Sequence, residues 1–191
     1  KKGAMHEGVT STLLGLPAMP AFAEELAVAR DLFILEYTQS RLHFLDISLK
    51  KSTELIRAAK KKKLQVTASV NAHHLAATDE AIGNYNTLFK TNPPLRTQSD
   101  IDALIKAIQD NTIDTITSQH LPHENDCKKL EFDKADFGII GLETSFALAN
   151  TALHTKVTTE QIIRLFSENP RKIAGIPTHT IQEESKADLT L

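Results

Sequence analysis

The stretch SDIDALIKAIQDNTIDTITSQHLPH, residues 99–123, contains one complete unit of the fold. Its first part has the spacing of one helix face, and Ser99 is a suitable N-cap. The apolar positions of that face are Ile101, Leu104, Ile105 and Ile108. The apolar run 113–116 then predicts a buried strand, and the polar residues after it predict a loop at the strand's carboxyl end.

Similar units precede this stretch. The pattern predicts a helix over 22–37, a strand over 42–47, a helix over 52–62 and a strand over 64–70. The first of these helices is expected to be amphipathic, with an apolar stripe made of Phe22, Leu26, Ala29, Phe33 and Tyr37. Helices that alternate with short apolar strands indicate an α/β fold with a parallel sheet covered by helices.

Downstream of residue 143 the pattern predicts two more helices. The second begins at Thr158 or Thr159 and is expected to stop near Asn169 and Pro170. The closing KADLTL, residues 186–191, is one more candidate strand, and it lies outside the alternation. No internal repeat is visible.

Composition excludes several classes of function. A net charge of −2 and the absence of Trp argue against a nucleic-acid surface, and the basic run 57–63 ends a helical pattern, where cations suit the helix dipole. A single cysteine, Cys127, rules out an intramolecular disulfide framework and fits a reducing compartment. No membrane-length apolar segment or signal peptide is present, so a cytoplasmic protein is expected. Because the chain opens at Lys1, we expect its natural start to precede it.

Three strand ends carry candidate chemistry: Asp46, the pair His73 and His74, and the loop 119–123. Ordinary structural roles compete with this interpretation. Asp46 would also serve as a helix cap or a loop acceptor, and NAHHL, 71–75, as a helix-start turn with one histidine bonded to the backbone. If the strand runs to 47, His43 and Asp46 face opposite sides and cannot share one ion without a bulge.

Longer motifs resemble one family. The segments GAMHEG (3–8), HHLAATDE (73–80), NPPLR (92–96), HLPH (120–123) and FGIIGLET (137–144) follow the order seen in bacterial-type dihydroorotases of the amidohydrolase superfamily. The resemblance implies the C-terminal portion of a (β/α)8 TIM-type barrel of the metal-dependent hydrolase kind, over residues 1–175. It also implies that 176–191 returns to a small accessory β domain, to which the final strand belongs.

Two positions depart from the family's pattern. The family motif H-x-x-H-V-S is matched by 43–48, with Asp46 at the second histidine, a metal ligand in the family. The motif T-D-H-A-P-H is matched by 118–123, with Gln119 at the aspartate that touches zinc and acts as general base. A primary amide neither takes up a proton near neutral pH nor binds a divalent metal well, so we expect Gln119 to be inactive and no metal to be bound. Asp46 would still accept a hard cation through oxygen.

The positions that match the family's substrate-binding residues depart less from the family pattern than the metal-site positions do. Asn92, His123 and the backbone of Phe137 and Gly138 match positions that the family uses to hold dihydroorotate. An asparagine amide pairs with an imide edge and a histidine with a carboxylate, although a Pro-rich loop and a Gly turn also serve folding alone. Asp136, where the family has Pro, places a new negative charge beside this pocket.

The resemblance therefore predicts a dihydroorotase-like pseudoenzyme of pyrimidine biosynthesis that assembles with aspartate transcarbamoylase, as catalytically dead homologues do. The alternative is an active zinc dihydroorotase, or a related cyclic amidohydrolase that interconverts dihydroorotate and carbamoyl-aspartate, with a rearranged metal site. An H-x-H strand upstream of Lys1 would favour the alternative. Homo-oligomer formation stays open, and no nucleic-acid or membrane partner is expected.

Overall fold

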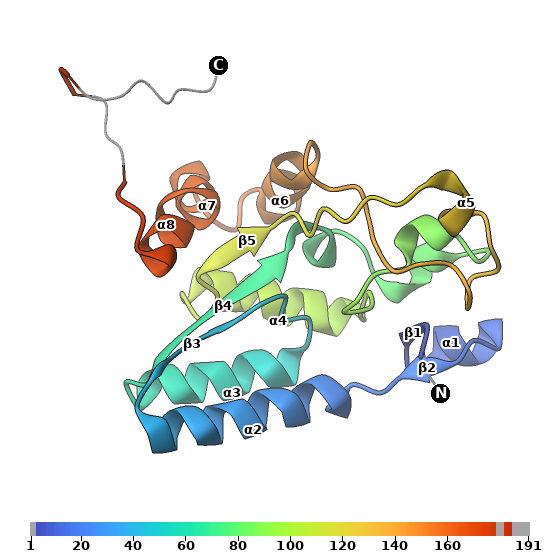
Figure 1. Ribbon diagram of the computed structural model, residues 1–191, viewed down its shortest axis with the longest axis horizontal. Coiled ribbons are helices and arrows are strands. Elements are labelled where there is room, and N and C mark those ends of the chain that lie inside the picture. Colours follow the sequence, from blue (N-terminus) through green and yellow to red (C-terminus); the bar gives the residue numbers. More distant parts are fainter. Residues whose placement is uncertain (1–2, 179–181, 185–191) are drawn as a thin grey trace.

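The main sheet consists of three parallel strands in the order β3-β4-β5. The computed structural model describes residues 3–178 and 182–184. The strands are β3 (Arg41–Phe44), β4 (Gln65–Asn71) and β5 (Thr115–Thr117), which confirms the predicted α/β alternation. Helices α2 (Phe22–Thr38), α3 (Lys50–Lys61) and α4 (Gln98–Gln109) connect or precede them and lie along one side of the sheet (Figure 1).

The remaining elements are short. The amino-terminal part contains β1 (Met5–His6), α1 (Val9–Leu14) and β2 (Ala18–Met19), a small parallel pair that sequence patterns did not predict. Between β4 and α4 lie the 3-10 turns η1 (Ala72–Leu75), η2 (Asp79–Ile82) and η3 (Thr87–Phe89). After β5 come α5 (Asn125–Lys128), α6 (Ser145–Leu153), α7 (Thr159–Phe166) and α8 (Glu168–Ala174).

The two faces of the sheet differ in chemistry. Alternate strand residues, among them Val66, Ala68 and Ile116, join the main core with buried residues of the covering helices. The intervening residues are polar, and the register pairs them with one another: His43 with Thr67, Ser69 with Thr115, and Asn71 with Thr117. Because successive side chains of a strand point to opposite faces, apolar burial holds one face and leaves the other free for polar chemistry.

Helix α2 turns a different face inward from the one its apolar stripe predicts. Phe33 and Tyr37 are 74% and 91% exposed, and Phe22 and Leu26 are exposed as well. The residues that pack into the core are Val28, Leu32 and Leu35. The helix carries two apolar stripes: Val28, Leu32 and Leu35 pack into the core, whereas the predicted stripe is mostly exposed and reaches α3 only where Ala29 and Phe33 line a cavity beside it.

Several predicted boundaries were wrong. The N-cap of α4 is Thr97, not Ser99, because Thr97 forms a capping box with Asp100. Strand β3 stops at Phe44, before the left-handed backbone of Asp46 (φ 60°). Strand β5 begins at Thr115, two residues later than expected.

At the carboxyl-terminal side, Thr158 is the cap of α7, and its hydroxyl accepts a bond from the Gln161 amide at 3.2 Å. Pro170 does not end the helical region; it lies in the first turn of α8, where no backbone donor is needed. The candidate strand 186–191 lies outside the described residues, and the predicted boundary at 175 stays a prediction. None of the described helices is both long and apolar enough to cross a membrane.

We expect Leu104→Ala to lower the free energy of unfolding by about 2–5 kcal/mol, because its fully buried side chain lies between α4 and the sheet. Chemical denaturation with linear extrapolation measures the change. The control Leu13→Ala, at an 81% exposed residue of α1, should stay within about 0.5 kcal/mol of the parent. Equal losses in both variants would contradict the assigned core.

Candidate functional site

The carboxyl ends of the three strands meet at one edge of the sheet, and a polar cluster lies there. The hydroxyl of Thr117 lies 3.0 Å from Oδ1 of Asp46 and 2.5 Å from Oδ1 of Asn71, so its one proton serves two acceptors. The backbone amide of Asp46 donates to the Ser69 hydroxyl at 2.9 Å. Asp46 is therefore a loop acceptor, which was the simpler of the two sequence interpretations.

Gln119 joins this cluster from the loop after β5. Its Nε2 donates to Oδ2 of Asp46 at 3.0 Å and to the backbone carbonyl of Asn92 at 2.7 Å. Both oxygens of Asp46 thus accept hydrogen bonds from protein groups. The two positions that depart from the family motifs therefore lie side by side and are hydrogen-bonded to each other.

His73 and His74 lie in η1, with ring centroids 4.5 Å apart. Nε2 of His74 donates to the carbonyl of Pro94 at 3.1 Å, which confirms the helix-start turn with one histidine on the backbone. Burial, reinforced by the neighbouring imidazole, lowers the pKa of His73 to about 3. Burial also lowers the pKa of His74 to about 4, although its bond to Pro94 opposes the shift. Both rings are therefore neutral at physiological pH.

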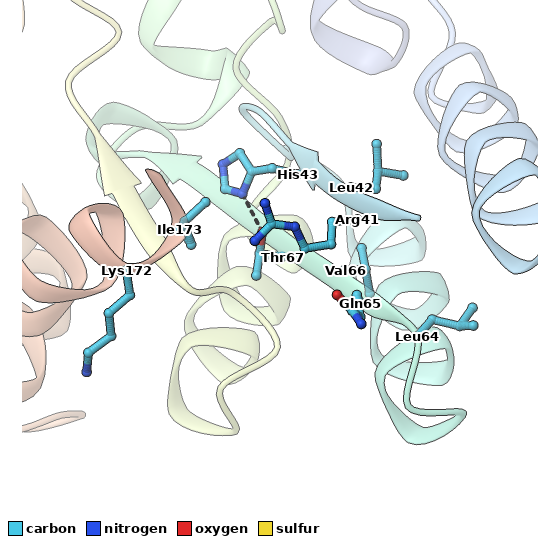
Figure 2. A pocket seen from close by; sticks show the side chains of 9 residues that line it. All are labelled: Arg41, Leu42, His43, Leu64, Gln65, Val66, Thr67, Lys172 and Ile173. Carbon is cyan, nitrogen blue, oxygen red and sulfur yellow. Dashed lines mark hydrogen bonds between the residues drawn. The ribbon is translucent and has the colours of Figure 1, made fainter. Parts of the chain in front are cut away.

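His43 belongs to a different part of the sheet. Its Nδ1 pairs with the hydroxyl of Thr67 at 2.7 Å, and both line a cavity of about 430 Å³ at the amino-terminal ends of β3 and β4 (Figure 2). Lys172 and Ile173 of α8 close its other side (Figure 2). Burial lowers the pKa of His43. Because β3 ends before Asp46, the parity argument that separated the two residues does not apply.

The predicted substrate residues form two groups. Nε2 of His123 donates to the carbonyl of Phe137 at 2.8 Å, and His123 and Gly138 line a cavity of about 300 Å³. A Cβ at Gly138 would overlap the Leu121 carbonyl and the His123 ring, so this close approach requires glycine. Asn92 does not line this cavity; its carbonyl belongs to the Asp46 cluster. Asp136 places a carboxylate oxygen 3.8 Å from Nδ1 of His123.

Sequence reasoning missed two buried cations that anchor the surrounding loops. Nζ of Lys90 donates to the carbonyls of Asp133 and Ala135 at 3.1 and 2.6 Å, beneath the Phe137 ring. Arg96 is 4% exposed and bonds Ser48, Glu24 and His6. Arg96 ends the NPPLR motif and Lys90 stands two residues before it, so attention to that motif's charged neighbours would have found them.

The described residues do not fit the zinc that the resemblance implies. Within 3–178 and 182–184, no group of three or more histidine, cysteine or acidic side chains is arranged to hold a metal ion. Both oxygens of Asp46 already accept hydrogen bonds, and an amide N–H points at one of them. Nε2 of His73 is buried without a hydrogen-bond partner, and the nearby Gln119 side chain opposes the lowering of the His73 pKa.

Comparison with known proteins shows the family to which this chain is related. No family model matches the chain. A dihydroorotase from Thermoanaerobacter sp. (strain X514) is 46% identical over 192 residues, which cover 100% of this chain and 44% of that protein. A dihydroorotase from Pelotomaculum thermopropionicum is 44% identical and matches 99% of this chain and 45% of its own length.

The chain is a relative of the dihydroorotases. It spans less than half the length of the curated dihydroorotases it matches. Among solved structures, the L-hydantoinase (dihydropyrimidinase) of Arthrobacter aurescens superimposes with a TM-score of 0.77 at 26% identity, over 83% of this chain and 36% of that one.

An inactive dihydroorotase-like domain of the Chaetomium thermophilum CAD-like multifunctional protein has a TM-score of 0.60 at 22% identity, over 79% of this chain and 42% of that one, a likeness of fold alone. These neighbours are TIM-barrel amidohydrolases. They confirm that this dihydroorotase relative forms a portion of such a barrel.

We expect the stability of this dihydroorotase relative to fall as the pH drops from about 6.5 toward 3. His73 and His74 stay neutral in the folded state but take up protons near pH 6.5 once unfolded, so their contribution is complete above 6.5 and is lost below it. Each contributes a slope of at most about 1.4 kcal/mol per pH unit. In His74→Gln, whose amide nitrogen can replace Nε2, denaturation between pH 4 and 6 should show roughly one proton fewer taken up on unfolding. An unchanged slope would contradict the neutral, buried pair.

Proposed function

We propose that the chain is part of a dihydroorotase-like protein of pyrimidine biosynthesis that has lost ordinary turnover and acts as an assembly partner of aspartate transcarbamoylase. The sequence relation supports the first half of this statement, because the match to dihydroorotases extends over the whole chain. The cluster at the carboxyl edge supports the loss of turnover. The partnership rests on the resemblance to families in which non-catalytic homologues serve this role.

One observation carries the loss of turnover: the amide of Gln119 donates a hydrogen bond to Asp46 at 3.0 Å. A general base needs a free lone pair of suitable pKa, and a metal ligand needs one directed at the ion. Here the residue at the base position offers a proton instead. A general base contributes roughly 10²–10⁴ in rate, and loss of metal-generated hydroxide costs more.

The cavity beside His123 supports a protein that keeps the shape of a substrate pocket but not the free polar groups needed to bind an anionic substrate. The cavity beside His123 persists, with Gly138 packed against the His123 ring. The ring already donates to the Phe137 carbonyl, however, and Asp136 faces its other nitrogen. An anionic substrate would meet this carboxylate, so we infer weak binding of dihydroorotate at best.

The alternative, an active zinc enzyme with a rearranged site, finds support in one observation. Nε2 of His73 is buried, has no partner, and belongs to a ring that stays neutral, which is the protonation state a metal ligand needs. Residues outside this chain would have to supply the other ligands. Metal content distinguishes the two functions.

We expect the purified protein to carry less than about 0.1 zinc ion per chain after dialysis and to open the dihydroorotate ring at least about 10⁴-fold more slowly than a typical enzyme, because its base position is an amide. Elemental analysis and a spectrophotometric assay measure the two quantities. Stoichiometric zinc together with ordinary turnover would establish the alternative function.

The exposed stripe of α2 offers a surface for assembly, since its aromatic residues are too exposed to contribute much to this chain's own core. We expect sedimentation of the protein mixed with aspartate transcarbamoylase from the same organism to show a joint species. Phe33→Asp should weaken that species at least about tenfold, because a charge would enter an apolar contact. The control Leu13→Asp, on the exposed side of α1, should not. Two independent boundaries at micromolar concentration would contradict the partnership.

A further inference from the structure

We propose that the carboxamide of Gln119 is a neutral cross-link that takes the place of a cation at the carboxyl edge of the sheet. It joins three chain segments that are distant in sequence: the loop after β3 through Asp46, the loop after β5 through its own backbone, and the loop before α4 through the Asn92 carbonyl. This inference rests on the proposed loss of zinc chemistry. It is tested by protein stability, whereas the proposed function is tested by zinc content and turnover, so one can be contradicted without the other.

The Nε2 group of Gln119 lies between two oxygen atoms, which is a position that a small cation could also occupy. The two acceptors of Gln119 are a carboxylate oxygen at 3.0 Å and a carbonyl oxygen at 2.7 Å. Two oxygens that face one point repel each other unless a positive group lies between them. The Nε2 group supplies two N–H donors there without adding net charge.

Other groups do not supply this link. Within the described part of the chain, no lysine, arginine or histidine forms an ion pair with Asp46. Apart from Gln119, the donor to the Asp46 side chain among these residues is the Thr117 hydroxyl. That hydroxyl has one proton, which Asn71 also accepts. Removing the Gln119 amide would therefore leave Asp46 short of donors in a partly buried position.

The backbone at both ends of the cross-link is in the left-handed region, with φ of 60° at Asp46 and 44° at Gln119. Residues with a Cβ seldom adopt this conformation without local compensation, and the hydrogen bond between the two side chains provides it. The third segment is held independently, because Arg96 bonds Ser48 at 2.9 Å and thereby ties the NPPLR loop to the loop after β3. The NPPLR loop and the loop after β3 are therefore joined twice, by the Arg96–Ser48 bond and by the bonds of Gln119 to Asn92 and Asp46.

The oxygens that the amide separates are hard donors, so the cation that could replace it is a hard one such as Mg²⁺ or Ca²⁺. The test uses thermal unfolding of the whole chain in three variants at pH 7, with and without 10 mM of each ion in turn. Gln119→Met keeps the length and removes both donors. Gln119→Glu brings a second carboxylate to Asp46. Gln98→Glu is the matched control, since Gln98 also donates to an aspartate, Asp102, at 2.9 Å, but on the exposed face of α4.

We expect Gln119→Met to lower Tm by roughly 3–6 °C and Gln119→Glu by roughly 5–10 °C. Added Mg²⁺ or Ca²⁺ should restore at least about half of the loss in Gln119→Glu, and should leave the parent, Gln119→Met and Gln98→Glu within about 1 °C. The inference is overturned if Gln119→Met melts with the parent, or if the ions fail to raise Tm of Gln119→Glu.

A second variant keeps the test decisive where Gln119→Glu does not fold. In Asp46→Asn combined with Gln119→Glu, the amide and the carboxylate exchange places and one hydrogen bond between them re-forms. We expect this double variant to fold and to melt above Gln119→Glu, yet below the parent, because the exchanged carboxylate then faces the Asn92 carbonyl. A double variant that is also unfolded would show that the cross-link is not the source of the stability.

Discussion

The parallel alignment of β3, β4 and β5 is the constraint on which the rest depends. Parallel strands in one sheet end at the same edge, and the register pairs Asn71 with Thr117 as the last residues of their strands. Loops that are far apart in sequence must therefore leave the sheet together. Asp46, Thr117 and Gln119 come into contact for this reason alone, before any requirement of chemistry.

That contact brings the Asp46 carboxylate and the Asn92 carbonyl to the same side chain, and their negative oxygens would repel each other without a positive group between them. The partly buried carboxylate of Asp46 needs hydrogen-bond donors or a cation, since a buried polar group without a partner costs about 1–3 kcal/mol, whereas the carbonyl of the exposed residue Asn92 can also be solvated by water. Here Thr117 and Gln119 donate to Asp46, and Gln119 also satisfies the Asn92 carbonyl. The two hydrogen bonds to Asp46 engage both of its carboxylate oxygens, which are the atoms of this side chain that a metal ion would contact.

The sequence predicted the alternation and the three strands, because hydrophobic periodicity determines them locally. That Asp46 and Gln119 belong to one site was implied only by the resemblance to dihydroorotases. It did not predict which stripe of α2 is buried, since two stripes have similar apolarity and only tertiary packing selects Val28, Leu32 and Leu35. It also did not anticipate Thr117 as a donor or the bond between the Asn92 carbonyl and Gln119. A backbone carbonyl has no signature in sequence, and the Asn92 contribution is its carbonyl.

The separation of apolar and polar faces explains how the fold tolerates such a site. The core lies between the sheet and its helices and is built from residues such as Val66, Val70 and Ile116, whose side chains point away from the polar cluster. Substitutions at the carboxyl edge therefore leave the main hydrophobic contribution to stability unchanged. Because the apolar core and the polar cluster lie on opposite faces of the same strands, the side chain at a position such as 119 can vary while the barrel portion around it is retained.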